Sequence, residues 1–220
     1  MIDKEKIFLE FLNENKLNTE NCIRNYKNKR MIFKKEIDGK IYFIKKYIPY
    51  GRREKTIAFG LYRDRVNHYE YISKKLDKLG IKYVPVIYSK IKRDSFFKRS
   101  SILVTEYGGE TLEVYENSYK DNIDLFKEFF DIYIKLYKNG IYCTDYNFGG
   151  VLVNDKRELV LIDFDAYKTK LFLTKKFKKR LFFELKTKMN DVRKHKQLEE
   201  FCEKELQRVI KELHWGNFKK

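Results

Sequence analysis

The chain has little of several features that mark particular protein classes. Its 220 residues include 2 prolines, 1 tryptophan and 3 cysteines, at Cys22, Cys143 and Cys202. Cysteines that are odd in number and far apart exclude a disulfide framework and a structural zinc site, so a reduced, cytoplasmic protein is expected. No apolar run approaches the ~20 residues needed to cross a bilayer, so any membrane contact is expected to be peripheral.

Acidic residues are also few relative to basic ones. There are 49 Lys and Arg against 32 Asp and Glu, which gives a formal net charge of +17. This charge favours polyanionic partners, namely nucleic acid, an anionic membrane or a phosphorylated glycan, and disfavours cationic substrates. A hydrophobic content of 43%, with 18 Phe and 17 Tyr, excludes a disordered chain. The length fits one domain or one two-lobed unit.

Two short apolar runs each end in an aspartate. Residues 141–144 lead into Asp145, and residues 159–162 lead into Asp163. A carboxylate at the end of a buried run is costly unless a cation compensates it. Two such carboxylates on adjacent elements therefore suggest a shared cation. Phosphoryl transfer needs such a pair, one for the acceptor hydroxyl and one for magnesium.

The first part of the chain is predicted to form an antiparallel sheet. Residues 1–29 resemble a polar, helix-prone lead-in, and strands over 31–33 and 41–44 then flank Asp38-Gly39, a strong hairpin signal. The second strand ends in Lys45-Lys46. Strands over 83–88 and 101–105 complete the sheet, with a charged turn expected around residues 92–94.

Helices are predicted from apolar residues at helical spacing. One spans 63–79 and ends at Gly80, with Glu70 beside its apolar stripe. A second, over 123–137, is expected to form the core of the later part of the chain and to end at Asn139-Gly140. Residues 50–61 are predicted to be a basic connector between the sheet and the first helix.

The stretch 166–195 is dominated by Lys and Arg. Its apolar residues recur every fourth position, so a helix would hold them along one side; they are Leu173, Phe177, Leu181, Leu185 and Met189. Such a helix either packs on the rest of the protein with a solvated basic back, or lies on an anionic bilayer. A final core helix is expected over 198–213.

The residues around the two aspartates resemble a known family. Asp145 and Asp163 fall on the H-x-D-x-x-x-x-N and D-F-G patterns of protein-kinase-like enzymes. The form Leu161-Ile162-Asp163-Phe164-Asp165 is most similar to the lipopolysaccharide core kinases, the heptose and Kdo kinases of bacterial envelope synthesis. Cys143 stands where this family has histidine, and Gly150 stands where it has the asparagine that binds a second metal ion.

The resemblance implies an α+β, bilobal protein-kinase-like fold. A small antiparallel N-lobe would span residues 1–107, and a mainly helical C-lobe would span 108–220. The implied cofactors are ATP and Mg²⁺. In this alignment Asp145 is the catalytic residue that receives the acceptor proton, Asp163 is the metal ligand, and Lys45, with Lys46 as the alternative, binds the α- and β-phosphates.

Further roles follow from the resemblance. Glu70 would pair with Lys45 and orient it, although an ordinary i,i+4 pair with Lys74 is equally compatible with the sequence, and Glu54 is a weaker candidate. The carbonyl of Glu106 and the amide of Gly108 would bind the adenine edge. Since Gly150 cannot ligate metal, Asn147 and Asp165 are the candidates for the second metal ligand.

The expected function is transfer of the ATP γ-phosphate to a sugar hydroxyl, a heptose of the lipopolysaccharide core, at the anionic surface of the inner membrane. Two alternatives stay open. Gly150, Cys143 and the missing G-x-G-x-x-G loop permit a kinase-like protein that binds without turnover. The basic stretch permits an RNA-associated protein, although the sequence has no RNA-reading motif. The sequence does not determine the oligomeric state.

Overall fold

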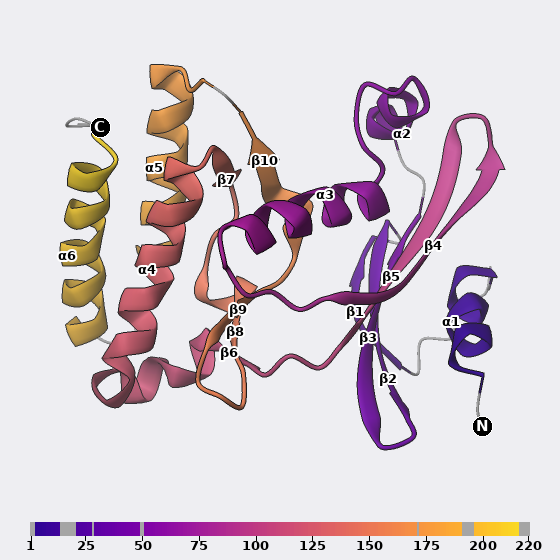
Figure 1. The fold of residues 1–220 in the computed structure, drawn as a ribbon, viewed down its shortest axis with the longest axis horizontal. Helices are drawn as coiled ribbons and strands as arrows, with labels where there is room; N and C mark the ends of the chain where they lie inside the picture. Colours follow the sequence, from indigo (N-terminus) through magenta and orange to yellow (C-terminus); the bar gives the residue numbers. More distant parts are fainter. Residues whose placement is uncertain are drawn as a thin grey trace. The chain divides into compact units, whose positions relative to one another are not determined.

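The structure is a computed structural model that describes residues 3–13, 21–27, 29–48, 51–170, 172–190 and 196–215, except for the side chains of residues 53, 54 and 190. Figure 1 shows its helices and strands. The chain divides into two compact units. The first comprises Met1–Lys74 and Val84–Tyr107, and the second comprises Lys75–Tyr83 and Gly108–Lys220.

The first unit is built on a five-stranded antiparallel sheet of order β1-β2-β3-β5-β4. Its strands are β1 (Cys22–Tyr26), β2 (Arg30–Ile37), β3 (Lys40–Tyr47), β4 (Val86–Ser95) and β5 (Lys98–Glu106). The predicted hairpin is confirmed, because Asp38 and Gly39 have the positive φ angles, 52° and 71°, that a tight turn requires. The prediction of a lead-in without strands was wrong, since β1 lies within it. Its pattern of mostly exposed residues gives no period-2 signal.

Helices cover the two faces of this sheet. On one face Tyr42 and Ile44 of β3 share a core cluster with Phe8 and Leu12 of α1 (Lys4–Asn13). Alternation along the strand directs Lys45 to the opposite face, where its Nζ donates to the Tyr69 hydroxyl of α3 (Arg65–Lys78) at 3.1 Å. The predicted end of α3 is confirmed, because Gly80 follows it with φ 60°.

Two connections of the first unit differ from the prediction. The β4–β5 turn is formed by Phe96 and Phe97, whereas residues 92–94 belong to β4. The charges there were mistaken for a turn because an exposed hairpin arm is polar on both faces. The expected connector over 50–61 contains the helix α2 (Gly51–Ala58), which buries Ile57.

The second unit is mainly helical. Its helices are η2 (Leu112–Asn122), α4 (Ile123–Lys138), α5 (Lys175–Asn190) and α6 (Lys196–Glu212). The apolar side of α4 forms the core, as predicted, and Gly140 follows with φ 72°. Short strands complete the unit, in the sheets β6-β8-β9 and β10-β7; they are β6 (Glu110–Thr111), β7 (Ile141–Cys143), β8 (Val151–Val153), β9 (Leu159–Leu161) and β10 (Tyr167–Thr169). An antiparallel sheet unit and a mainly helical unit together confirm the predicted α+β class.

The basic helix α5 uses its apolar side inside the second unit. Leu181, Leu185 and Met189 are buried, and the Phe182 ring meets that of Trp215 with centroids 6.0 Å apart. Lys175, Lys176 and Lys179 are exposed. Of the two arrangements considered from the sequence, α5 therefore has the first: its apolar side packs on the protein and its basic side faces solvent. Within the described residues, no helix combines the length and apolar character that a membrane crossing requires.

Candidate active site

The two predicted aspartates lie on adjoining loops of the second unit. Asp145 follows β7, and Asp163 follows β9. Backbone hydrogen bonds join the two segments: the Thr144 amide donates to the Ala166 carbonyl at 3.3 Å, and the Ile162 amide donates to the Gly150 carbonyl at 3.3 Å. Main-chain hydrogen bonds therefore hold the two loops next to each other.

Buried aromatic residues anchor the loop that carries Asp145. Tyr146 and Phe148 are buried, whereas Asp145 between β7 and these anchors is exposed. The Tyr146 hydroxyl donates to the Phe129 carbonyl of α4 at 2.9 Å, and both loop aromatics pack on the Phe129 ring. Alternation of inward aromatic and outward polar residues therefore fixes the loop on the core helix while Asp145 faces solvent.

Asn147 stabilises this loop from within. Its Oδ1 accepts from the Gly150 amide at 3.0 Å, which caps the short helix η3 (Phe148–Gly150). Its Nδ2 donates to the Asp145 carbonyl at 3.0 Å and to the Asp145 carboxylate at 3.2 Å. These contacts make Asn147 a positioning residue for Asp145.

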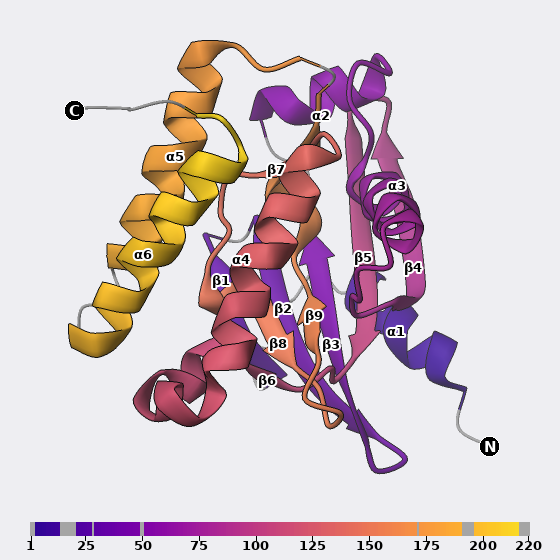
Figure 2. The ribbon, with the colours of Figure 1, turned by 60° about the vertical axis from the view of Figure 1, so that its left-hand side comes forward.

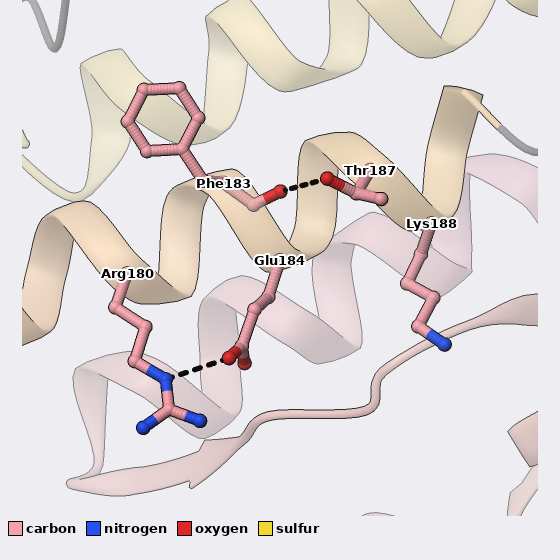
Figure 3. A pocket seen from close by; sticks show the side chains of 5 residues that line it. All are labelled: Arg180, Phe183, Glu184, Thr187 and Lys188. Atoms are coloured by element: carbon pink, nitrogen blue, oxygen red, sulfur yellow. Dashed lines mark hydrogen bonds and ion pairs between the residues drawn. The ribbon is translucent and has the colours of Figure 1, made fainter. Parts of the chain in front are cut away.

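A lysine that the sequence did not single out pairs with Asp145. The Nζ of Lys188, on α5, lies 2.9 Å from the Asp145 carboxylate. Figure 3 shows Arg180, Glu184 and Lys188 leaving α5 on the same side, with Arg180 paired to Glu184 at 2.7 Å. These side chains, with Phe183 and Thr187, line a hollow of about 250 Å³, which is below the usual volume of a pocket for a ligand as large as a nucleotide.

Asp163 has a backbone conformation that is uncommon for a residue other than glycine. Its φ is 58° and its ψ is 67°, in the left-handed region. Such conformations cost free energy and concentrate at functional sites. The next residue, Phe164, is buried and packs on Tyr83 and Tyr167, which holds the strained turn in place. Asp165 lies half-buried in η4 (Phe164–Ala166).

Cys143, two residues before Asp145, is a structural residue. Its side chain is buried, and on β7 it lies opposite Tyr167 of the neighbouring strand β10. Burial raises the pKa of its thiol strongly, and the negative charges of Asp145 and Asp163 raise it further. The thiol therefore stays protonated and is a poor nucleophile.

The candidates of the first unit are distributed over both faces of the sheet. Lys45 is half-buried on the α3 face, whereas Lys46 is buried on the α1 face. Glu70 has the alternative pairing considered from the sequence, with Lys74 Nζ at 2.6 Å, and both side chains are largely exposed. The side chain of Glu54 lies outside the described residues.

The residues expected to bind adenine stand where the two units meet in sequence. Glu106 ends β5, and its carboxylate pairs with Lys40 at 3.4 Å. The next amide, that of Tyr107, donates to the Ile41 carbonyl at 3.0 Å, so the Glu106 carbonyl points away from β3. Gly108 is the first residue of the second unit in this region. Its role and that of Glu106 stay predictions.

The carboxylates of the two loops fit a magnesium site better than a site in which protein side chains supply all the ligands. Among the residues that the structure describes, no three His, Cys, Asp or Glu side chains cluster as a metal site would require. Magnesium commonly uses one or two carboxylates and completes its octahedron with water and phosphate oxygens. Asp163, with Asp145 on the adjoining loop, is compatible with that pattern.

Sequence reasoning found the two aspartates and missed what surrounds them. Lys188 lies among many lysines of α5 and carries no distinguishing signal, because its partner is 43 positions away in the chain (188 − 145). Tyr146 and Phe148 could have been found, because two aromatic residues alternating with polar ones after Asp145 indicate an anchored loop.

Comparisons with known proteins give fold-level likenesses only. No protein-family model and no curated protein matches the chain. Among solved structures, the chain is similar to WaaP in complex with acyl carrier protein, with 15% identity, a TM-score of 0.48, and coverage of 86% of this chain and 89% of that one. It is also similar to monomeric WbdD, with 16% identity, a TM-score of 0.49, and coverage of 88% and 45%. Scores at this level carry no conclusion about activity.

Proposed function

We propose that the protein is an ATP-dependent phosphotransferase. The observation that supports this most is the pair of aspartates on adjoining loops joined by main-chain hydrogen bonds, Asp145 exposed and Asp163 in a left-handed conformation. Asp145 would accept or orient the proton of the acceptor hydroxyl. Asp163 would hold Mg²⁺, which neutralises phosphate charge when bound.

Basic residues would supply the remaining charge neutralisation. Lys45 is proposed to bind the α- and β-phosphates, with Lys46 less suited because it is buried on the α1 face. Lys188, at 2.9 Å from Asp145, would hold this carboxylate before substrate binds and offer its ammonium to the transferred phosphoryl group. Preorganised charges of this kind provide much of the rate in phosphoryl transfer.

The proposed acceptor is a hydroxyl of a lipopolysaccharide core heptose. Two observations support it. The residues 161–165 resemble those of the lipopolysaccharide core kinases, and the net charge of +17 suits a glycan that already carries phosphates and acidic sugars. Cationic acceptors would be repelled.

The proposal is tested by transfer of labelled γ-phosphate to dephosphorylated lipopolysaccharide core. The parent should label the core, and Asp145→Asn should lower the rate by about 10²–10⁴-fold, the usual contribution of a positioned acid or base. Asp155→Asn is the matched control, because Asp155 is an exposed aspartate in the turn after β8, and its rate should equal that of the parent. Equal labelling by parent and Asp145→Asn would overturn the proposal.

A second candidate is a kinase-like protein that binds nucleotide without turnover. Gly150 has no side chain, so the asparagine that the kinase-like pattern places here to bind a second metal ion is missing. This candidate predicts ATP binding without consumption in the presence of every core acceptor. ATP consumption that the core stimulates would exclude it.

A further inference from the structure

The first unit exposes aromatic side chains that its own core does not use. Phe59, Phe96 and Phe97 are 63%, 57% and 41% exposed. Their rings nevertheless touch one another, since the Phe97 centroid lies 5.7 Å from that of Phe59 and 4.8 Å from that of Phe96. Figures 1 and 2 both show α2 beside the far end of the β4–β5 hairpin. These three residues are called the aromatic tip below.

The β4–β5 turn does not by itself explain why Phe96 and Phe97 are aromatic. Phe96 and Phe97 are the whole turn, because Ser95 and Lys98 pair directly across it. Neither residue is among the non-glycine residues with a positive φ, so the backbone of this turn accepts phenylalanine. Nothing in its geometry, however, requires two exposed aromatic side chains. Exposed apolar patches of this kind often mark interaction sites.

The third aromatic residue is held outward by a regular helix cap. After α2 the amide of Gly60, at φ 71°, donates to the Ile57 carbonyl at 3.0 Å, and the amide of Leu61 donates to the Thr56 carbonyl at 2.9 Å. This is the Schellman pattern of hydrogen bonds. Ile57 anchors the helix in the core, while Leu61, beside Phe59, is 73% exposed. The exposure of Phe59 thus follows from an ordered cap.

Positive charge surrounds the aromatic tip. The Arg93 guanidinium lies 5.4 Å from the Phe96 ring centroid. Arg93 and Arg99 are direct cross-strand partners, an arrangement of like charges that is unfavourable unless an anion compensates it. Lys98, next to the turn, is also exposed. Residues 92–99 contain four cations and one acid, Asp94, whose carboxylate accepts from the Ser100 hydroxyl at 2.6 Å, so cations outnumber acids around the apolar rings.

We propose that the aromatic tip and its bordering cations bind an anionic lipid bilayer. The rings would enter the boundary between headgroups and acyl chains, and Arg93, Lys98 and Arg99 would bind lipid phosphates. A second copy of the chain is disfavoured because its charge is also +17, and the centres of protein interfaces are depleted in charge. The apolar side of α5 is buried within the second unit, so this helix does not offer its apolar residues to a bilayer. This inference does not depend on the proposed phosphotransferase activity.

The test is sedimentation of the full chain with vesicles of phosphatidylcholine, made with or without phosphatidylglycerol. The parent should bind only the anionic vesicles. The double variant Phe96→Ser/Phe97→Ser should lower the partition coefficient by about tenfold or more, and Arg93→Gln/Arg99→Gln should lower it by about fivefold per charge. The matched control is Phe172→Ser, which removes a phenylalanine that is 88% exposed in the second unit, and it should bind as the parent does.

Folding is checked separately by circular dichroism and melting temperature. Both double variants change exposed or partly exposed residues, so they should keep the parent's values. A second readout uses Phe97→Trp, whose emission should shift to the blue and be quenched by brominated lipid. Equal binding by parent and Phe96→Ser/Phe97→Ser, or an equal loss in Phe172→Ser, would overturn the proposal. Self-association of the parent that the tip variant loses, with no vesicle binding, would overturn it in favour of a second copy.

Discussion

Two glycines of the second unit have opposite tolerance for a side chain. At Gly150 an added Cβ would meet only Asn147 Oδ1 and the Asp145 carbonyl, at 3.8 and 3.9 Å, which is ordinary contact. At Gly109, with φ 122°, it would lie 2.0 Å from the Val153 carbonyl oxygen. The backbone therefore leaves room for a side chain at Gly150, whereas Gly109 is required by close backbone approach.

This difference predicts that Gly150→Asn folds normally and gains metal affinity. The free energy of unfolding should stay within about 0.5 kcal/mol of the parent, as for surface substitutions, while ATP binding should require less Mg²⁺. Gly109→Ala should lose about 1–3 kcal/mol from overpacking in addition to backbone strain. Urea unfolding and a magnesium titration measure the two effects. A Gly150→Asn protein as unstable as Gly109→Ala would contradict the local geometry.

The three cysteines are predicted to differ in reactivity. Cys143 and Cys202 are buried, and burial raises the pKa of the Cys202 thiol to about 12 and that of Cys143 strongly. Cys22 is only partly buried. A thiol-specific chromogenic reagent should therefore modify Cys22 rapidly in the native protein, and all three thiols in denaturant. Rapid native labelling of Cys143 would contradict its assignment as a structural residue.

At the scale of elements, α5 combines packing with a contact to the site. Its apolar side is buried in the second unit, and Lys188 reaches Asp145. If Lys188 serves the reaction, Lys188→Met should lower kcat of phosphate transfer by about 10²-fold, as loss of one preorganised charge does, with little change in KM for ATP. Lys176→Met, at an exposed position of the same helix, is the control. Equal kcat in the two variants would remove Lys188 from the proposed mechanism.

The elements also show which features of the fold can be predicted from sequence patterns. The Asp38-Gly39 hairpin, the stops at Gly80 and Gly140, and the strands before Asp145 and Asp163 were predictable because each depends on local backbone chemistry. Strand β1 and the pairing of Lys188 were not, because they depend on contacts between distant segments. Glu70 illustrates the same limit: the helix position was correct, but sequence spacing could not distinguish Lys74 from Lys45 as its partner.

At the scale of the whole molecule, buried tyrosines of the second unit set an alkaline limit. Burial raises the pKa of Tyr137 to about 12, from the ordinary value of 10, and raises the pKa values of Tyr133, Tyr146 and Tyr167 well above 10. Below pH 10 both folded and unfolded states keep these protons. Above it the unfolded state loses them first, so the free energy of unfolding should fall as pH rises from 10 to 12.

Tyrosinate absorbance and circular dichroism, followed together, measure this limit. A group of tyrosines should ionise only in step with the loss of the folded signal. Ionisation of all 17 tyrosines before any unfolding would contradict the burial of this aromatic core.

The proposed function requires Asp163 to hold the metal of bound ATP while Asp145 serves the acceptor. Calorimetric titration of ATP with and without Mg²⁺, in the parent, Asp163→Asn and Asp145→Asn, separates these two roles. We expect Mg²⁺ to strengthen ATP binding in the parent and in Asp145→Asn, and we expect Asp163→Asn to lose this strengthening. An unchanged magnesium effect in Asp163→Asn would show that this carboxylate does not hold the metal.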